Sequence, residues 1–190
     1  GVILYVATDD LTSSGRGLYK VLDDRVGPAV ASPLGNLPYY PTTIAVALGA
    51  NPATDIIYAA LGDGVDRKIH KSLNGGQTFF QSSVGLTGSM ADCHNVVISP
   101  ADPNVLYVRA RWWGGLFYSH DGAAHWQLTA DGDVGNLSTR ATNGDVRFGV
   151  NLPPIPHPLH ADVALSETRS TLVKTTNGGI TWSYSSSGYL

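Results

Sequence analysis

The chain has 190 residues, 43% of them apolar, and a formal net charge of -3 from 12 basic and 15 acidic side chains. This length allows one substantial domain, and the scattered basic residues cannot neutralise a nucleic-acid backbone, which excludes that partner. No apolar run approaches the roughly 20 residues that cross a bilayer, so we expect no membrane anchor. The single cysteine, Cys93, allows no internal disulfide and no cysteine-based zinc site, and we expect neither a metal nor a cofactor.

Short strands follow one another along the chain, and no segment has a sustained helical period with caps. Runs of β-branched and aromatic residues end at Gly, Pro, Asn or Asp, which is typical of strands joined by turns. In chain order the predicted strands are 2–8, 17–21, 42–48, 55–61, 68–72, 95–99, 104–110, 116–119, 146–150, 161–166 and 171–175. The sequence therefore predicts an all-β fold.

Three segments share one pattern: a hydroxyl residue, any residue, Asn or Asp, Gly, and an aromatic residue four positions after that Gly. The Asn or Asp side chain can accept backbone N–H groups in a tight turn, and Gly takes φ > 0 at little cost. The aromatic residue then begins the next strand and can bury its ring. We predict a structural role for Ser72, Asn74, Gly76 and Phe79, for Ser119, Asp121, Gly122 and Trp126, and for Thr175, Asn177, Gly179 and Trp182.

A weaker copy at 21–25 lacks the hydroxyl, the Gly and the aromatic residue. Units of four strands that repeat about every 50 residues are typical of β-propeller blades. We predict a single array of about four four-stranded blades, or part of a larger propeller, with blades at 1–35, 36–85, 86–131 and 132–190. The first blade lacks its opening strand, and an open propeller exposes edges that pair with other chains. We therefore expect a homo-oligomer, or missing blades supplied by another chain.

The repeated turn resembles the Asp-box, or BNR repeat, of sialidases, sortilin-type receptors, xyloglucan-cleaving glycosidases and photosystem assembly factors. The phrases at 51–58 and 97–108 are closest in character to the xyloglucanase and sortilin-like branch. This resemblance implies a β-propeller with its Asp-box turns on the outer edge of each blade, away from the axis where ligands bind. It specifies the fold and leaves the function open.

The loops between the second and third strands of each blade, and those between blades such as 32–41, are expected around one end of the axis. Arg109, Arg111, Trp112 and Trp113 stand in one of them. Two adjacent Trp residues cannot both face one side of a strand, so one indole should be accessible to stack on a sugar or hold a peptide. The alternative is that both rings pack between blades.

This loop favours a non-catalytic, lectin-like propeller that binds a glycan or a protein ligand. An assembly scaffold that contacts another protein is not distinguished from it by the sequence. Three histidines, His94, His157 and His160, lack the spacing of metal ligands, and the proline-rich stretch 153–158 is predicted as a stiff loop. A glycosylation sequon at Asn136 and a start at Gly1 without an initiator Met favour a secreted or extracellular protein.

A glycoside hydrolase of the xyloglucanase type is the alternative from a different class. Asp9 and Asp10 follow a predicted strand and resemble the strand-end position of the catalytic Asp in xyloglucan hydrolases. Hydrolysis normally needs a second carboxylate within about 5 to 10 Å, and Asp63, Asp66 and Asp92 are candidates by loop position. Solvated loop carboxylates are the plainer interpretation. Sialidase activity is disfavoured, because the Arg-Ile-Pro motif of that family is absent.

Overall fold

The computed structural model describes residues 1–8, 17–61, 68–86, 93–110, 115–130, 153–167 and 172–185. Every regular element within these ranges is a β-strand, which confirms the all-β prediction. The described part of the chain contains no helix long and apolar enough to cross a membrane.

The strands form four antiparallel sheets, and each sheet is built from consecutive strands. Sheet 1 contains β1 (Val2–Thr8), β2 (Gly17–Asp23) and β3 (Val30–Leu34). Sheet 2 contains β4 (Pro41–Ala47), β5 (Ile56–Leu61), β6 (Ile69–Ser72) and β7 (Phe80–Gln81). Sheet 3 contains β8 (Cys93–Ile98), β9 (Leu106–Ala110), β10 (Leu116–Ser119) and β11 (Gln127–Leu128). Sheet 4 contains β12 (Ile155–Pro156), β13 (Ala164–Glu167), β14 (Leu172–Thr175) and β15 (Ser183–Tyr184).

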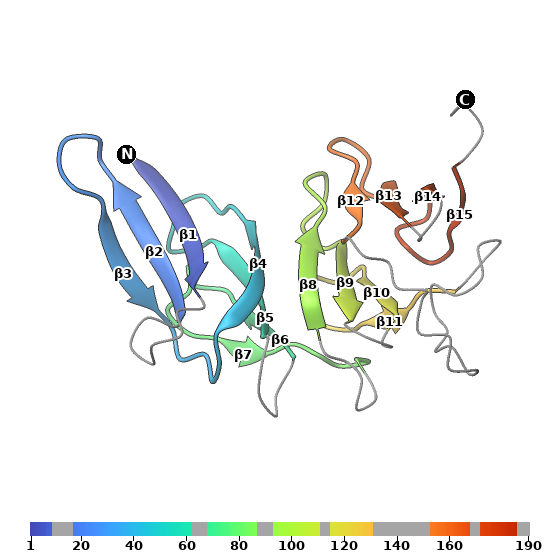
Figure 1. Cartoon of the computed structure of the whole chain (residues 1–190), viewed down its shortest axis with the longest axis horizontal. Helices are drawn as coiled ribbons and strands as arrows, with labels where there is room; N and C mark the ends of the chain where they lie inside the picture. The colour runs from blue at the N-terminus through green and yellow to red at the C-terminus, as the bar shows by residue number, and fades with distance from the viewer. Residues whose placement is uncertain are drawn as a thin grey trace.

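The four sheets lie side by side in a row, with the two termini at opposite ends (Figure 1). The first strands of sheets 2 and 3 meet directly, since the Val96 N–H donates to Thr43 Oγ1 at 3.0 Å. Sheet 1 has three described strands where the other sheets have four, and β1 takes the place of their second strand.

Two sequence-based boundaries were wrong. The stretch 153–158, predicted as a loop, contains β12, in which Pro156 pairs with Ala164. Proline is compatible with this strand because β12 is the edge of its sheet and need not donate outward. The predicted inter-blade loop 32–41 also begins too early, since β3 continues to Leu34. The predicted strand 146–150 lies outside the described residues.

The repeated turns join the third and fourth strands of sheets 2, 3 and 4, and we call them the box turns: 72–79, 119–126 and 175–182. In the first, the Ser72 hydroxyl donates to Asn74 Oδ1 (2.9 Å) and accepts the Gly76 N–H (2.9 Å). Asn74 Oδ1 also accepts the Thr78 N–H (3.0 Å), and all three bonds recur in the other two turns. The two residues after each Asn or Asp have φ between 64° and 94°, and all are Gly except Ala123.

The turn of sheet 1 begins later than predicted, because β2 continues to Asp23. Its side-chain hydrogen bonds differ from those of the box turns. Asp23 Oδ1 accepts the Arg25 N–H at 2.8 Å, and Asp24 Oδ1 accepts the N–H groups of Val26 and Gly27 at 2.9 and 3.2 Å. The degenerate copy therefore keeps a carboxylate-stabilised turn but carries two acidic side chains and no aromatic residue.

The aromatic residue of each box turn packs on the preceding sheet, and all three rings are buried. The pairs are Phe79 with Leu18, Trp126 with Tyr58, and Trp182 with Tyr107. Burial of a ring of this size contributes about 2 to 3 kcal/mol. We call the contacts between neighbouring sheets the first, second and third junctions, in chain order.

Hydroxyl groups that follow the fourth strands also cross the junctions. Ser82 Oγ donates to the Ala123 carbonyl at 2.6 Å in the second junction. Thr129 Oγ1 donates to the Gly179 carbonyl in the third. The second and third box turns are therefore bound to the sheet before them through both the ring and the main chain.

Candidate functional site

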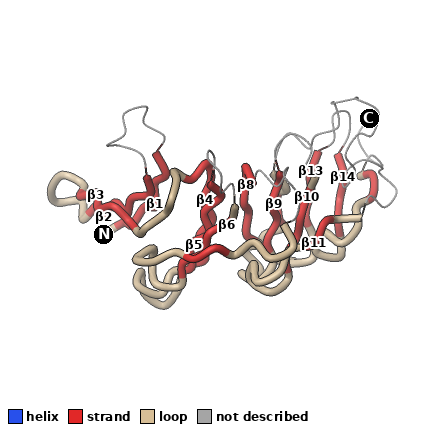
Figure 2. Tube along the Cα trace, turned by 90° about the horizontal axis from the view of Figure 1, so that it is seen from below, coloured by secondary structure: helices blue, strands red, loops and turns tan. Residues whose placement is uncertain are grey.

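The strand register places two kinds of loop at opposite edges of the row. The box turns lie along one edge, where Figure 2 shows the tan loops below the strands. At the other edge β1 ends at Thr8, which pairs with Gly17, and β9 ends at Ala110, whose N–H donates to the Gly115 carbonyl at 3.0 Å. We call this second edge the loop edge.

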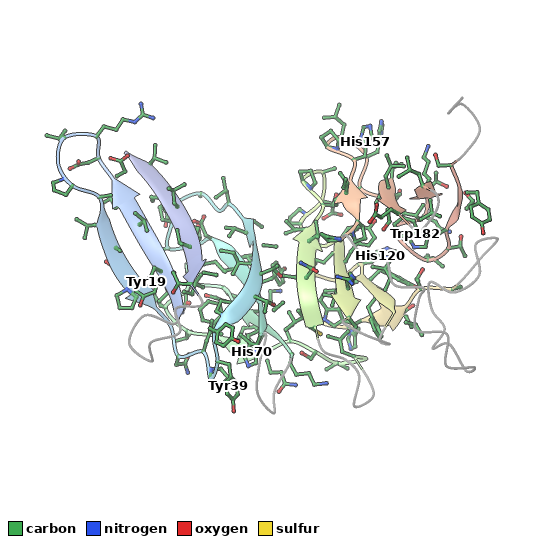
Figure 3. All side chains as sticks on the ribbon, viewed as in Figure 1. Tyr19, Tyr39, His70, His120, His157 and Trp182 are labelled. Carbon is green, nitrogen blue, oxygen red and sulfur yellow. The ribbon has the colours of Figure 1, made fainter. Side chains whose placement is uncertain are left out.

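A pocket of about 340 Å³ opens at the loop edge of sheet 1. Three tyrosines and two prolines dominate its lining, which is Gly17, Leu18, Tyr19, Pro33, Leu34, Gly35, Leu37, Pro38, Tyr39 and Tyr40. Figure 3 shows Tyr19 and Tyr39 at the same end of sheet 1. Flat aromatic rings with polar hydroxyl ends suit the apolar faces and hydroxyl groups of a sugar.

The pocket forms because three chain segments meet there. The sheet register pairs Leu18 with Leu34 and Tyr19 with Pro33, which sets the start of β2 beside the end of β3. Gly35 then turns the chain at φ 60°, and a Cβ at this position would lie 2.5 Å from the ring of Phe79. The close approach of Gly35 to sheet 2 holds the following segment, which carries Tyr39 and Tyr40, at the loop edge.

The predicted catalytic residues Asp9 and Asp10 lie outside the described residues, as do Asp63, Asp66 and Asp92. The segment that carries Asp9 and Asp10 begins directly after Thr8, whose partner Gly17 lines the pocket.

Of the four residues predicted to bind a ligand, Arg109 is described, and it stands near the loop-edge end of β9, paired with Leu116. Arg111, Trp112 and Trp113 lie outside the described residues, and so does the sequon at Asn136. Arg109 belongs to sheet 3, and the tyrosine pocket belongs to sheet 1. Arg109 and the tyrosine pocket therefore share an edge of the row and come from different sheets.

The box turns lie along the opposite edge, and of their aromatic residues Phe79 also approaches Gly35 in the lining of the tyrosine pocket. A second pocket, of about 310 Å³, opens there between the last two box turns and is lined by Tyr118, Ser119, His120, Asp121, His125, Gln127 and Ile180. Its polar atoms are largely engaged: His120 Nε2 lies 2.9 Å from the Gly178 carbonyl, and His125 Nδ1 lies 2.7 Å from Asp121 Oδ2. The polar side chains of this pocket therefore stabilise the turns that line it.

Electrostatics at this edge also reflect the turn. Burial raises the pKa of the Asp121 carboxyl, but hydrogen bonds from the His125 N–H, the His125 ring and the Ser119 hydroxyl lower it by more, so the pKa lies below its ordinary value. Within the described ranges, no group of three His, Cys, Asp or Glu side chains could hold a metal ion. His157 and His160 stack on each other, with ring centroids 4.7 Å apart.

No protein-family model matches the chain, and no curated protein matches it. Among solved structures it is similar to an ancestral GH74 enzyme, with 19% identity over 95% of this chain and a TM-score of 0.65. It is also similar to YCF48 bound to D1 peptide, with 13% identity over 90% of the chain and a TM-score of 0.53. The four sheets are blades of the β-propeller type. The GH74 xyloglucanase from Xanthomonas campestris matches at 16% identity over 91% of the chain, with a TM-score of 0.48.

These likenesses concern the fold. The chain spans 22% of the ancestral GH74 enzyme, 28% of the xyloglucanase and 47% of YCF48. The described blades form a row and not a closed ring (Figure 1). The Asp-box assignment stays a prediction, because it rests on the turn motif and no family model matches.

The tyrosine pocket was not predicted from the sequence. A signal was available in Pro38-Tyr39-Tyr40-Pro41, where two aromatic residues stand between prolines in a loop that joins two blades. Tyr19, however, is separated from them by a whole strand and a turn. Only the register between β2 and β3 brings these tyrosines to one place.

Proposed function

We propose that the chain is a non-catalytic, lectin-like β-propeller module that binds carbohydrate at its loop edge. The observation that carries this proposal is the pocket whose lining includes Tyr19, Tyr39 and Tyr40. Stacking of tyrosine rings on sugar faces needs no charged partner, which agrees with a pocket built from aromatic, proline, leucine and glycine residues. Trp112 and Trp113, in a loop that leaves sheet 3 at the same edge, are proposed to extend the binding surface.

The test measures binding of soluble β-glucans and other polysaccharides by affinity electrophoresis, after a glycan array has identified the ligand class. The double variant Tyr39→Ala/Tyr40→Ala should bind at least about fivefold more weakly, since each lost stacking contact costs about 0.5 to 1.5 kcal/mol. Tyr184→Ala is the matched control, because Tyr184 is an exposed tyrosine on sheet 4, far along the row. Equal binding by the double variant and the wild type would refute the assignment of the pocket as the sugar-binding site.

A glycoside hydrolase is the second proposal. It is supported by the position of Thr8, after which Asp9 and Asp10 follow, beside the pocket-lining Gly17, and by the likeness to the ancestral GH74 enzyme. Reducing-sugar release from a β-glucan would distinguish it from pure binding. Asp9→Asn and Asp10→Asn should each be assayed, and turnover that survives both substitutions would remove these residues from the mechanism.

A protein ligand is the remaining alternative within the binding class, as YCF48 is a propeller described with a bound peptide. Trp112→Ala/Trp113→Ala discriminates between the surfaces. If sugar binding falls in the tyrosine variant and stays unchanged in the tryptophan variant, the pocket acts alone.

A secreted or extracellular location and glycosylation at Asn136 also remain proposals, which a mobility shift after glycosidase treatment of the secreted protein would test.

A further inference from the structure

Sheet 1 has an apolar face that no described residue covers. Its other face packs on sheet 2 through Tyr5, Ala7, Leu18 and Leu34. Because strand side chains alternate and directly paired residues share a face, the opposite set points away from sheet 2. That set, which we call the outer face of sheet 1, is Val2, Leu4, Val6, Tyr19, Val21, Asp23, Ala31 and Pro33, and all of these but Asp23 and the Tyr19 hydroxyl are apolar.

The equivalent positions elsewhere in the row are buried. Val21 begins the degenerate copy of the turn as Ser72 begins the first box turn. Because Leu4 pairs with Val21 and Ile57 pairs with Ser72, Leu4 is the counterpart of Ile57. Leu4 is 53% exposed, whereas Ile57 is 0% exposed because sheet 1 covers it. An apolar surface at the position of a sheet-to-sheet contact is therefore left open at this end of the row.

At the other end of the row, no described residue covers the far face of sheet 4. Leu165 lies at the register position of Tyr58 and Tyr107, the residues through which sheets 2 and 3 contact the sheet that follows. Leu165 is 38% exposed and its strand partner Ile155 is 68% exposed, whereas Tyr107 is 0% exposed. Together with Lys174, these residues define the outer face of sheet 4.

Sheet 4 also carries the polar groups that join a sheet to the next one. In the second junction, Lys71 Nζ donates to the Gly122 carbonyl at 2.7 Å, and Ser82 Oγ donates to the Ala123 carbonyl. Lys174 pairs with Leu165 as Lys71 pairs with Tyr58. Ser185 follows β15 as Ser82 follows β7, and both N–H groups donate back to the third strand of their sheet.

We propose that the outer face of sheet 1 in one copy of the chain docks on the outer face of sheet 4 in a second copy, head to tail. The contact continues the side-by-side arrangement of the three junctions and joins two apolar faces that a single chain supplies. It also brings opposite charges together, because the turn at 23–27 stands where a box turn would and carries Asp23 and Asp24. Lys174 of one copy therefore meets acidic side chains of the other.

This contact is heterologous, so two copies close a ring if the rotation between them allows it, and otherwise a longer array forms. Tyr19 and Pro33 belong both to the outer face of sheet 1 and to the tyrosine pocket. A docked second copy would accordingly form one wall of that pocket. The inference goes beyond the proposed binding function and does not require it.

The first measurement is the solution mass of the whole chain by light scattering, from about 5 to about 200 μM, a range that spans ordinary micromolar affinities. A mass of two copies, or species that grow with concentration, is expected. A monomer throughout this range would overturn the proposal, and would leave a further blade of a longer polypeptide as the cover of these faces.

Two variants test the direction of the contact. Leu4→Glu and Leu165→Glu should each weaken association by roughly 30-fold or more, as expected when a charge replaces a central apolar contact residue. Both side chains are exposed in the single chain, so the strand signal in circular dichroism should be unchanged. Leu48→Glu is the matched control, since Leu48 is 83% exposed directly after β4 and belongs to neither outer face.

Mixing the two variants gives the decisive result. Each retains one intact face, so a one-to-one mixture should form a dimer of defined mass although neither variant associates alone. No dimer in the mixture, or an equal effect of Leu48→Glu, would refute a head-to-tail contact. Tyr39→Ala/Tyr40→Ala, measured in parallel, separates the two proposals. If this variant loses sugar binding but still associates, the pocket binds sugar independently of the contact between copies.

Discussion

The second and third junctions are built from the same turn, but their buried polar groups are satisfied differently. In the second, the Tyr58 hydroxyl donates to the Gly122 carbonyl at 3.3 Å, and Trp126 Nε1 donates to the Ser82 carbonyl at 2.9 Å. In the third, the equivalent Tyr107 hydroxyl and Trp182 Nε1 are buried without a hydrogen-bond partner among the described residues. A buried polar group left in this state costs about 1 to 3 kcal/mol.

Residues outside the repeated motif account for part of this difference. The Gly178 carbonyl, which corresponds to that of Gly122, is bonded to His120 Nε2 at 2.9 Å. Lys71, which also donates to Gly122, is replaced in sheet 3 by Tyr118, whose hydroxyl donates to Gln127. The motif therefore determines where the aromatic ring packs, whereas neighbouring side chains determine whether its polar atoms are paired.

The largest expected effect comes from removing the aromatic ring of the second junction, in which the buried polar groups are hydrogen-bonded. Trp126→Ala should lower the free energy of unfolding by about 3 to 5 kcal/mol, because it leaves a cavity and an unpaired Ser82 carbonyl. Urea unfolding followed by fluorescence measures this. Leu128→Ala, an exposed position in the next strand, should change stability by less than about 0.5 kcal/mol. A comparable loss in both variants would contradict this account of the junction.

Gly179→Ala tests how tightly the third junction is packed. Gly179 has φ 94°, and a Cβ there would lie 2.7 Å from Cε1 of Tyr107 and 3.0 Å from Cβ of Tyr118. We expect a loss of about 2 kcal/mol from the strained backbone and the displaced ring. Gly27→Ala, where a Cβ would meet no atom within 4 Å, is the control for thermal unfolding and should not lower the melting temperature.

One conservative substitution, made in the second and in the third junction, compares the hydrogen bonding of the two buried Trp side chains directly. Trp126→Phe removes a donor that is hydrogen-bonded, whereas Trp182→Phe removes a donor that is unpaired. The first should therefore cost about 1 kcal/mol more than the second, beyond the shared loss of ring area. Equal unfolding free energies for the two variants would show that Trp182 Nε1 is satisfied in solution.

The smallest effect concerns pH. The folded-state pKa of Asp121 is lowered, so its carboxylate stabilises the fold above the unfolded-state pKa, and this contribution is lost as the pH falls below about 4. Asp121→Asn keeps the turn acceptor, as Asn74 and Asn177 do in the other box turns. The stability difference between wild type and variant should shrink on acidification, measured by urea unfolding at pH 7 and near pH 3. A constant difference would exclude this titration.

The box turns could be predicted from the sequence because their hydrogen bonds are local. Every bond among Ser119, Asp121, Ala123 and His125 joins residues two or four positions apart. The all-β fold followed from the spacing of these turns and of the strands between them. The short strand β12 was missed because Ile155–Pro156 is too brief, and too rich in proline nearby, to show a strand pattern.

The candidate site depended on contacts that a sequence does not display. Tyr19 joins Tyr39 and Tyr40 only through the pairing of β2 with β3 and the tight approach of Gly35 to Phe79. The unpaired state of Tyr107 likewise depends on His120, which acts through a residue 58 positions away. Predictions from the sequence therefore succeed for turns and fail where distant segments compete for one carbonyl group.

The hydroxyl that follows the fourth strand has a consequence for how such a protein can change in length. Ser82 and Thr129 each bind the turn of the next unit, so the unit of sheet 3 supplies both a donor forward and a carbonyl backward. A duplicated copy of this unit would inherit both halves of the connection, and its neighbours would need no compensating substitution. Stability in such an array is the sum of units and nearest-neighbour contacts. Gene duplication could thus lengthen or shorten the row one unit at a time.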